Sequence, residues 1–561
     1  MPPESAPSLL PHMCAPSARN AILQPQTPIR GARIATSQRR IAFRGPRNAI
    51  SQPQSPLRSA AAERVRVAVP AARRAARYTA PAMHVPKTSS DAFVTRRRAL
   101  QRRFPGAALL AAGLPRSRNY RANRYAFRAA SHFLYFVGEH IPGAALLFAE
   151  GKATLFAEPP EADDALWHGP SPSFAELREI LALDAVRPLA ELDDALRAAG
   201  GSIDSPRSPP SGRPAIATLA TNDAQSSAWL SQRLGRSIGA CSSAALAAGS
   251  PDAALADAMI DLRLRHDDAA VAQLRAVAER SAAAHIAGMR ATRGARTEAE
   301  IAGAMIGELR RHGLGESYGP IVTVHGEVLH NESHLNPIEP GDLLLADVGG
   351  ETPEGWAGDI TRVWPVSGRF SPTQRAVYDV VLAAQKACVA AVRPGARYRD
   401  IHEMAKRVIV EGLRDLGIFR GDVGGLLERG AAAIFFPHGL GHLLGLDVHD
   451  MEDLGDRAGY APDRARSSRF GDCYLRLDRD LAPGMAVTIE PGFYMVPAIL
   501  ADASICGAVG ADLDRSTLEK FADVRGIRIE DDVLCTDGEP EVLTRAVPKD
   551  ASAVEDVMAA G

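Results

Sequence analysis

Four acidic residues stand at the ends of apolar segments, where an unpaired carboxylate is costly to bury. Asp347 ends a run of leucines, and Asp359 opens a strand-like segment after a turn that contains Gly and Pro. Glu490 and Glu530 end two further apolar segments. A hairpin across residues 349–358 would place Asp347 beside Asp359, and two like charges that close require a cation or a shared proton. A single such acid would be a strand end that faces solvent, whereas four with one pattern indicate a cation site.

Histidines gather in one short segment of mostly Gly and Leu, which contains His438, His442 and His449. The His438/His442 spacing is that of a zincin helix, but Gly439 stands where that motif requires Glu, so the helical zinc-protease motif is excluded. Three histidines together with the carboxylates indicate a metal site or an acid/base site. His330 is a further candidate.

Four carboxylates and one imidazole form a hard, oxygen-rich ligand set that favours Mn²⁺ or a similar ion. So many anions exceed the need of one ion and suit two ions roughly 3.5–4 Å apart that share a bridging water. Such a pair lowers the pKa of water and polarises a carbonyl, so the predicted chemistry is hydrolysis.

In their order and local sequence these residues resemble the pita-bread metallopeptidases. The sequence is most similar to aminopeptidase P and prolidase, which cleave the bond before proline. The resemblance is carried by residues 438–450, 490–494 and 528–532, and residues 125–138 look like the family's substrate-side motif. It implies an α+β fold, with a smaller α/β domain at residues 86–250 and a pita-bread catalytic domain at residues 251–561, and it implies a homodimer.

The resemblance also implies roles for individual residues. The implied ligands of two divalent ions are Asp347, Asp359, His442, Glu490 and Glu530. Glu490 would in addition act as general base. Three histidines would hold the substrate carbonyl, stabilise the oxyanion and relay a proton to the proline nitrogen: His330, His438 and His449. The implied substrate-binding residues are His438, Arg476, Tyr494 and Arg528.

Two substrate classes remain open within the family. Arg476 stands where prolidases resemble one another in carrying an Arg for the carboxylate of a C-terminal proline, and the 40-residue link from Glu490 to Glu530 is prolidase-like. We therefore favour a dipeptidase. The alternatives are an Xaa-Pro aminopeptidase acting on longer peptides and, more distantly, an inactive pita-bread binding protein, which the full ligand set argues against. Two departures concern the loops: the Asp347–Asp359 interval is one residue longer than usual, and residues 325–328 (His-Gly-Glu-Val) replace the Asn-containing motif expected before His330.

Hydrophobic periodicity predicts the elements that position these residues. In the first domain we expect a helix capped by Asp91, a strand at 107–112 and a hairpin of strands 144–149 and 153–157. In the second we expect helices at 267–289, 372–392 and 398–416, and a helix that a capping box of Thr297 and Glu300 starts. The expected strands are 321–324, 343–348, 486–489 and 526–533.

The chain has 561 residues and a formal net charge of −1, which averages two different segments. Residues 1–82 hold 13 Arg and two acids, a charge of +11, so the remainder carries −12. We expect a disordered leader over residues 1–85. It could be an organelle transit peptide, a nucleic-acid or membrane-surface tail, or a translated upstream region before a start at Met83, the interpretation we favour.

Cysteine spacing and hydropathy indicate the cellular compartment in which we expect the protein. The six cysteines include no C-x-x-C pair, and no apolar run approaches the roughly 18 residues of a membrane span. We therefore expect a cytoplasmic enzyme, organelle-targeted if the leader is a transit peptide, that binds neither nucleic acid nor membrane. Its partner would be a proline-containing peptide.

Overall fold

The computed structural model describes residues 85–160, 164–200, 215–221, 223–239 and 246–560. Except for Val85, the leader predicted over residues 1–85 lies outside the described residues.

The first part of the described chain forms a mixed sheet with the strand order β4-β3-β2-β1-β5. Its strands are β1 (Ala108–Ala111), β2 (Ala145–Ala149), β3 (Lys152–Ala157), β4 (Ala185–Pro188) and β5 (Ala217–Thr218). The accompanying helices are α2 (Ser90–Arg103), α3 (Ser131–Val137), α4 (Asp164–Trp167), α5 (Phe174–Ile180), α6 (Leu192–Ala199) and α7 (Ala224–Leu234). Strands β2 and β3 pair in antiparallel fashion around Glu150 and Gly151, which both have positive φ. The α/β fold and this hairpin are confirmed, but Asp91 does not cap α2, because the N-cap is Ser89, which makes no side-chain cap bond.

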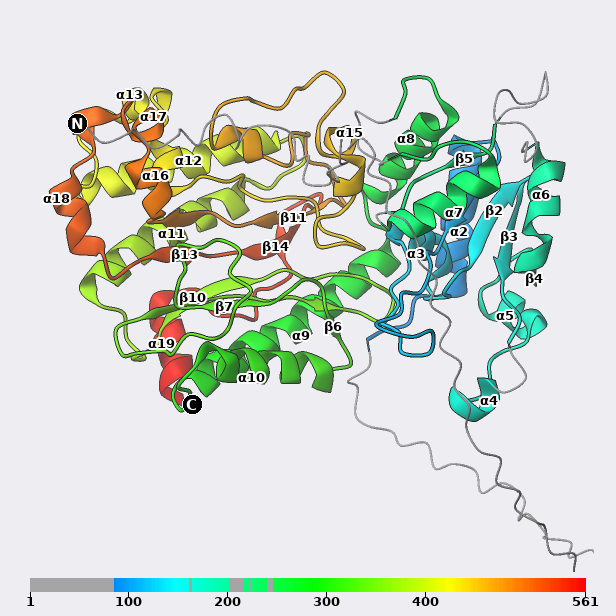
Figure 1. Ribbon diagram of the computed structural model, residues 1–561. Helices are drawn as coiled ribbons and strands as arrows, with labels where there is room; N and C mark the ends of the chain where they lie inside the picture. Colours follow the sequence, from blue (N-terminus) through cyan, green and yellow to red (C-terminus); the bar gives the residue numbers. More distant parts are fainter. Residues whose placement is uncertain (1–84, 161–163, 201–214, 222, 240–245, 561) are drawn as a thin grey trace, which may run out of the picture. The chain divides into compact units, whose positions relative to one another are not determined.

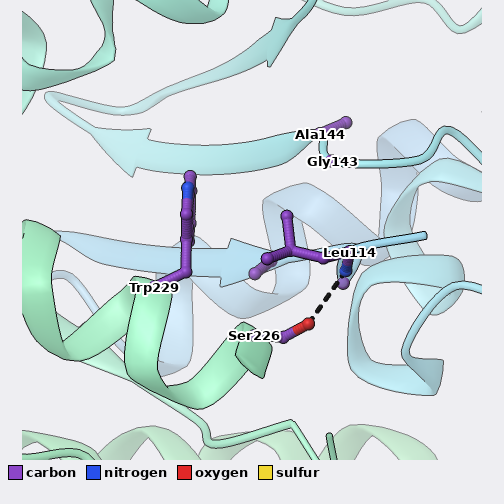
Figure 2. A pocket seen from close by; sticks show the side chains of 7 residues that line it. Leu114, Gly143, Ala144, Ser226 and Trp229 are labelled. Carbon is purple, nitrogen blue, oxygen red and sulfur yellow. Dashed lines mark hydrogen bonds between the residues drawn. The ribbon is translucent and has the colours of Figure 1, made fainter. Parts of the chain in front are cut away.

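A shallow apolar recess marks the point where the chain leaves β1. Figure 2 shows Leu114 beside Ser226 and Trp229 of α7, with Gly143 and Ala144 on the opposite side. The Leu114 amide donates to Ser226 Oγ at 2.8 Å. Helix α7 thereby anchors the start of the arginine-rich segment that continues to Arg128.

The second part contains long helices and several small sheets. The longer helices are α8 (Pro251–Arg263), α9 (Asp268–Thr292), α10 (Glu298–Arg311), α11 (Pro372–Ala391), α12 (Tyr398–Asp415) and α19 (Ala551–Ala560). The shorter ones are α13 (Val423–Glu428), α14 (Ala431–Phe435), α15 (Asp456–Gly459), α16 (Pro497–Ala501), α17 (Ala503–Cys506) and α18 (Arg515–Leu518). The strands are β6 (Gly315–Glu316), β7 (Ile321–Thr323), β8 (Leu343–Asp347), β9 (Gly350–Glu351), β10 (Thr361–Pro365), β11 (Ala486–Ile489), β12 (Gly492–Tyr494), β13 (Gly526–Arg528), β14 (Asp531–Leu534) and β15 (Glu541–Val542).

These strands lie between two layers of helices. Helices α11 and α12 lie on one side of β10, β13 and β14, and α9, α10 and α19 lie on the other (Figure 1). The sheets have the orders β10-β8-β7 and β11-β14-β15, with the pairs β12-β13 and β6-β9. The ends of β8 and β11, and the segments before β10 and after β13, carry the four acids singled out in the sequence.

Local sequence explains the best-predicted helix. Ser371 caps α11 and forms a capping box with Gln374, and Pro372 occupies the first turn, where its missing amide proton costs nothing. Buried side chains such as Val377, Tyr378 and Val381 attach the helix to the core.

Two predictions in this part are wrong in detail. No capping box forms at α10, because Thr297 makes no side-chain cap bond and Glu298 instead turns inward to accept hydrogen bonds from Thr323 and Val324. The strand expected at 526–533 is two strands in different sheets. Strand β13 pairs with β12, whereas β14 pairs with β11, so the chain changes sheets between Arg528 and Asp531. This crossing turns Glu530 toward the interior.

No helix of the described chain combines the length and the apolar character needed to cross a bilayer.

Candidate metal centre and active site

The pairing of β8 with β10 brings the first two acids together. Asp347 lies opposite Thr361 in this antiparallel register, and Asp359 precedes Thr361 by two residues. The Tyr318 hydroxyl lies 2.5 Å from Asp347 Oδ1 and 2.6 Å from Asp359 Oδ1. The predicted juxtaposition of the two aspartates is confirmed, and Tyr318 bridges them.

His442 joins this pair to the other two acids. Its Nε2 lies 3.4 Å from Asp359 Oδ2 and 3.5 Å from Glu490 Oε1. Ligand atoms of Asp359, His442 and Glu530 lie within 4.8 Å of one another, and all three residues are buried. Glu530 also accepts a hydrogen bond from Thr361 Oγ1 at 2.6 Å. The structure therefore brings the five proposed ligands into one centre.

The backbone fixes the orientation of His442. Its Nδ1–H donates to the Leu443 carbonyl at 3.0 Å, which directs Nε2 toward the carboxylates. The His442 amide donates to Thr488 Oγ1. A Cβ at Gly441 would lie 2.3 Å from the Thr488 carbonyl oxygen, so this close approach requires glycine.

The electrostatics of the centre are those of a cation site. Burial, together with the neighbouring carboxylates, raises the pKa values of Asp359 and Glu530 well above their usual range. Burial raises the pKa of Glu490 to about 7, although His442 and Arg528 oppose the shift. Because a divalent cation would relieve this repulsion, the residues present fit hard metal ions.

His438 belongs to a hydrogen-bonded chain on one side of the acids. Its Nδ1–H donates to the Gly439 carbonyl at 2.8 Å, and its Nε2 accepts from the Tyr494 hydroxyl at 2.9 Å. Arg528 donates to that hydroxyl at 3.0 Å and to Asp347 Oδ2 at 2.6 Å. Burial, assisted by the Arg528 charge, lowers the pKa of His438 to about 3, so this histidine is neutral.

His449 lies beside His442, with the two ring centroids 4.4 Å apart. Arg476 donates to His449 Nδ1 at 2.8 Å, and the same Nη1 contacts Glu452 at 2.8 and 2.9 Å. Burial and the nearby His442 and Arg476 lower the pKa of His449 far below its usual range. His330 is more exposed than the other two histidines, and partial desolvation of its ring, together with the charges of Arg528 and Arg476, lowers its pKa as well.

The sequence reasoning missed several residues of the centre. Thr361 shares a strand face with Asp359, so the period of two could have found it. Tyr318 carried no signal, because a lone tyrosine in a turn is uninformative until the sheet brings it to the aspartates. The same alternation could have found Thr488, which lies two residues before Glu490.

The raised carboxyl pKa values predict how the metal-free protein responds to pH. A carboxyl whose pKa rises on folding, here that of Glu490 from 4.5 to about 7, contributes stability that is full below 4.5 and is lost as pH rises through 7. The Tm of the protein in chelator should therefore fall between these values, and Glu490→Gln should make the fall shallower. Thermal melts at a series of pH values check this. Equal slopes for both proteins would contradict it.

Two family models match the chain. That of metallopeptidase family M24 matches residues 272–537, and that of the aminopeptidase P N-terminal domain matches residues 93–204. The class of protein is thus a two-domain metallopeptidase fold whose acid and histidine centre lies within residues 272–537, the part that matches family M24.

Individual relatives narrow this class. A probable Xaa-Pro aminopeptidase of Aspergillus fumigatus is 33% identical over 446 residues, which are 77% of this chain and 88% of that protein. One of Coccidioides posadasii is 38% identical over 317 residues, 55% of this chain, and the chain spans 65% of the length of that relative. The structure of Pseudomonas aeruginosa aminopeptidase PepP has a TM-score of 0.69 at 29% identity, covering 85% of this chain and 99% of that one. Escherichia coli aminopeptidase P with the inhibitor Pro-Leu has a TM-score of 0.67, also at 29% identity and with the same coverage. The chain belongs to the aminopeptidase P family of pita-bread metallopeptidases.

Proposed function

We propose that the protein is a metal-dependent exopeptidase that hydrolyses the Xaa-Pro bond at the N-terminus of short peptides. The observation that carries the proposal is the buried centre of Asp359, His442 and Glu530, flanked by His438 and His449. The names of the relatives support the substrate class.

The same centre supports the finer proposal of two divalent ions, with Mn²⁺ as the favoured metal. The residues that would hold them are Asp347, Asp359, His442, Glu490 and Glu530. When bound, the ions would acidify water and polarise the scissile carbonyl. Glu490 would accept the proton of the attacking water, since burial gives this carboxylate a raised proton affinity.

The histidines would supply hydrogen bonds to the substrate. Arg476 can only donate, so it fixes the neutral His449 with its proton on Nε2, the nitrogen that remains to donate. His449 and His330 would hold the carbonyl oxygen and pass a proton toward the proline nitrogen, which must be protonated as the tertiary amide breaks. His438, Tyr494 and Arg528 would fix the position of Asp347 and line the substrate side.

The test uses chelator-treated protein, to which Mn²⁺ is added back, and two substrates: an Xaa-Pro dipeptide and an Xaa-Pro-Yaa tripeptide. An Xaa-Ala-Yaa tripeptide is the control for proline specificity. We expect metal-dependent cleavage of the proline substrates only. Absence of cleavage of both, together with absence of bound metal, would overturn the proposal.

The choice between dipeptides and longer peptides depends on Arg476. This side chain is 35% exposed and lies beside His449, so it can meet a substrate carboxylate, which supports the dipeptidase. The relatives' names support the alternative, an aminopeptidase for longer peptides. Glu452 already pairs with Arg476, so a carboxylate would have to share the guanidinium with Glu452.

Replacing Arg476 by Ala should raise KM for the dipeptide about tenfold or more, whereas KM for the tripeptide should change by about twofold. The reason is that only the dipeptide places its carboxylate next to proline. Steady-state kinetics on both substrates check this. A uniform loss would show that Arg476 acts only through His449, and faster tripeptide cleavage by the unaltered protein would overturn the dipeptidase preference.

We also propose that the protein is a cytoplasmic homodimer. The family resemblance supports the dimer, and the cysteine spacing supports a reducing compartment. Sedimentation velocity tests the dimer, which a monomer at micromolar concentration would contradict.

A further inference from the structure

The loop of residues 446–453, which follows the metal-ligating His442 and carries His449, contains one residue in an unfavourable backbone conformation. Met451 has φ 59°, in the left-handed region that bulky side chains avoid, yet its side chain is buried. Residues in such conformations persist only where the surrounding structure over-determines them. The contacts that hold this conformation are made by Asp450 and Asp453, on either side of Met451.

Asp450 is held by a buried arginine from another element. Arg263, the last residue of α8, is 2% exposed and donates through Nη2 to Asp450 Oδ1 at 2.6 Å. The same oxygen accepts from the Asp447 amide at 3.1 Å, and the Asp450 amide donates to Leu443 O at 3.0 Å. A Cβ at Gly445 would lie 2.6 Å from the Asp450 carboxylate. Arg263 Nη2 also lies 3.5 Å from Asp447 Oδ2, so one side of the loop is packed tightly around this arginine and its two carboxylates.

Asp453 is held by the N-terminal domain. Arg263 Nη1 donates to His132 Nδ1 at 2.9 Å, so the neutral His132 carries its proton on Nε2. That Nε2–H donates to Asp453 Oδ2 at 2.9 Å. The adjacent Ser131 donates to Asp447 Oδ1 at 2.7 Å. Helix α3, which begins with Ser131 and His132, therefore contacts both ends of the loop.

We propose that Arg263 and His132 are positioning residues for His449. Together they connect Asp450 to Asp453 across the left-handed Met451 and so fix where His449 meets His442 and Arg476. The N-terminal domain then does more than cover the catalytic domain, since its α3 sets the geometry of the His449 loop. The catalytic consequence rests on the function proposed above, whereas the structural consequence does not.

The chain offers a matched control. Arg96 of α2 is also buried, and it binds both oxygens of Asp267 at 2.8 Å, where the second part of the chain begins α9. It contacts Tyr135 and Asp267 but no residue of the 446–453 loop in the described structure. Replacing Arg96 by Lys weakens another ion pair of a buried arginine, here with the 39% exposed Asp267, without touching the His449 loop.

The first measurement is amide hydrogen exchange of the metal-loaded protein. In Arg263→Lys, where one ammonium replaces the guanidinium fork, exchange in residues 446–455 should accelerate at least about tenfold, and in Arg96→Lys it should stay as in the unaltered protein. His132→Phe keeps a planar aromatic ring and removes both hydrogen bonds, so it should show the same acceleration. It serves as the second variant if Arg263→Lys does not fold. Unchanged exchange in the folded variants would overturn the proposal.

The second measurement separates kcat from KM on the Xaa-Pro-Yaa tripeptide. Arg263→Lys should lower kcat about 10- to 100-fold with KM and metal content little changed, because a misplaced group costs rate rather than binding. Arg96→Lys should retain kcat within about twofold. In the His449→Ala background, Arg263→Lys should cost nothing further, and full additivity would overturn the positioning role. If the unaltered protein cleaves no Xaa-Pro peptide, the proposed function fails and the exchange measurement alone decides this inference.

Discussion

Replacing Asp359 by Asn is expected to remove bound metal and to lower Xaa-Pro peptidase activity at least about 10³-fold. Metal ions supply several kcal/mol of transition-state stabilisation, and each 1.36 kcal/mol is a factor of ten in rate. Asp359 is buried at the centre of the site, next to His442 and Tyr318. Elemental analysis of the purified variant and steady-state kinetics with added Mn²⁺ check both parts.

The same substitution should leave the metal-free fold as stable as before, or more stable. Asp359 lies among buried carboxylates whose pKa values burial and mutual repulsion raise, so removing its charge relieves repulsion. Metal binding should raise the Tm of the unaltered protein and not that of the variant. A lower Tm in chelator would contradict this expectation and would show that losing the Asp359 carboxylate as a partner of Tyr318 costs more than the relieved repulsion gains.

A matched control for this variant is Asp478→Asn. Asp478 is also fully buried, but it is surrounded by cations, with Arg397 Nε at 2.7 Å and Arg399 Nε at 2.9 Å. Because these arginines are partly exposed, weakening their bonds to Asp478 should cost about 1–3 kcal/mol, without loss of metal. If both variants lost metal equally, the effect of Asp359→Asn would reflect general destabilisation.

The helices of the second part were predictable because their signals are local. Ser371 and Pro372 start α11 where expected, and the period of its apolar residues fixes its buried face. The strand predicted at 526–533 was wrong because periodicity does not show where a chain changes sheets. Glu530 lies at that change, with its amide bonded to Thr361 O, a contact between residues 169 positions apart.

The site follows the same rule. Acids at the ends of apolar segments were recognisable, because burying an unpaired carboxylate is costly and the pattern occurs four times. Tyr318, Arg263 and His132 were not, because a buried tyrosine, arginine or histidine becomes meaningful only through its partner. Arg263 meets Asp450 across 187 positions and His132 meets Asp453 across 321, and no local pattern encodes such distances.

Replacing Glu490 by Gln should lower kcat about 10²- to 10⁴-fold while KM for the Xaa-Pro substrates changes little. The amide keeps the shape of the side chain and one coordinating oxygen, but it cannot accept the proton of the attacking water. Its neighbours favour this role: Glu490 Oε1 lies 3.5 Å from His442 Nε2 and accepts from Thr488 Oγ1 at 3.4 Å.

The matched control for Glu490→Gln is Thr488→Val, which removes the hydroxyl and keeps the branched shape. It should lower kcat by less than about tenfold, because the carboxylate remains. Metal content of Glu490→Gln distinguishes the two roles of this residue. Retained metal with lost kcat indicates the general base, and loss of both indicates that ligation dominates. Activity of Glu490→Gln within tenfold of the unaltered protein would show that another group accepts the proton.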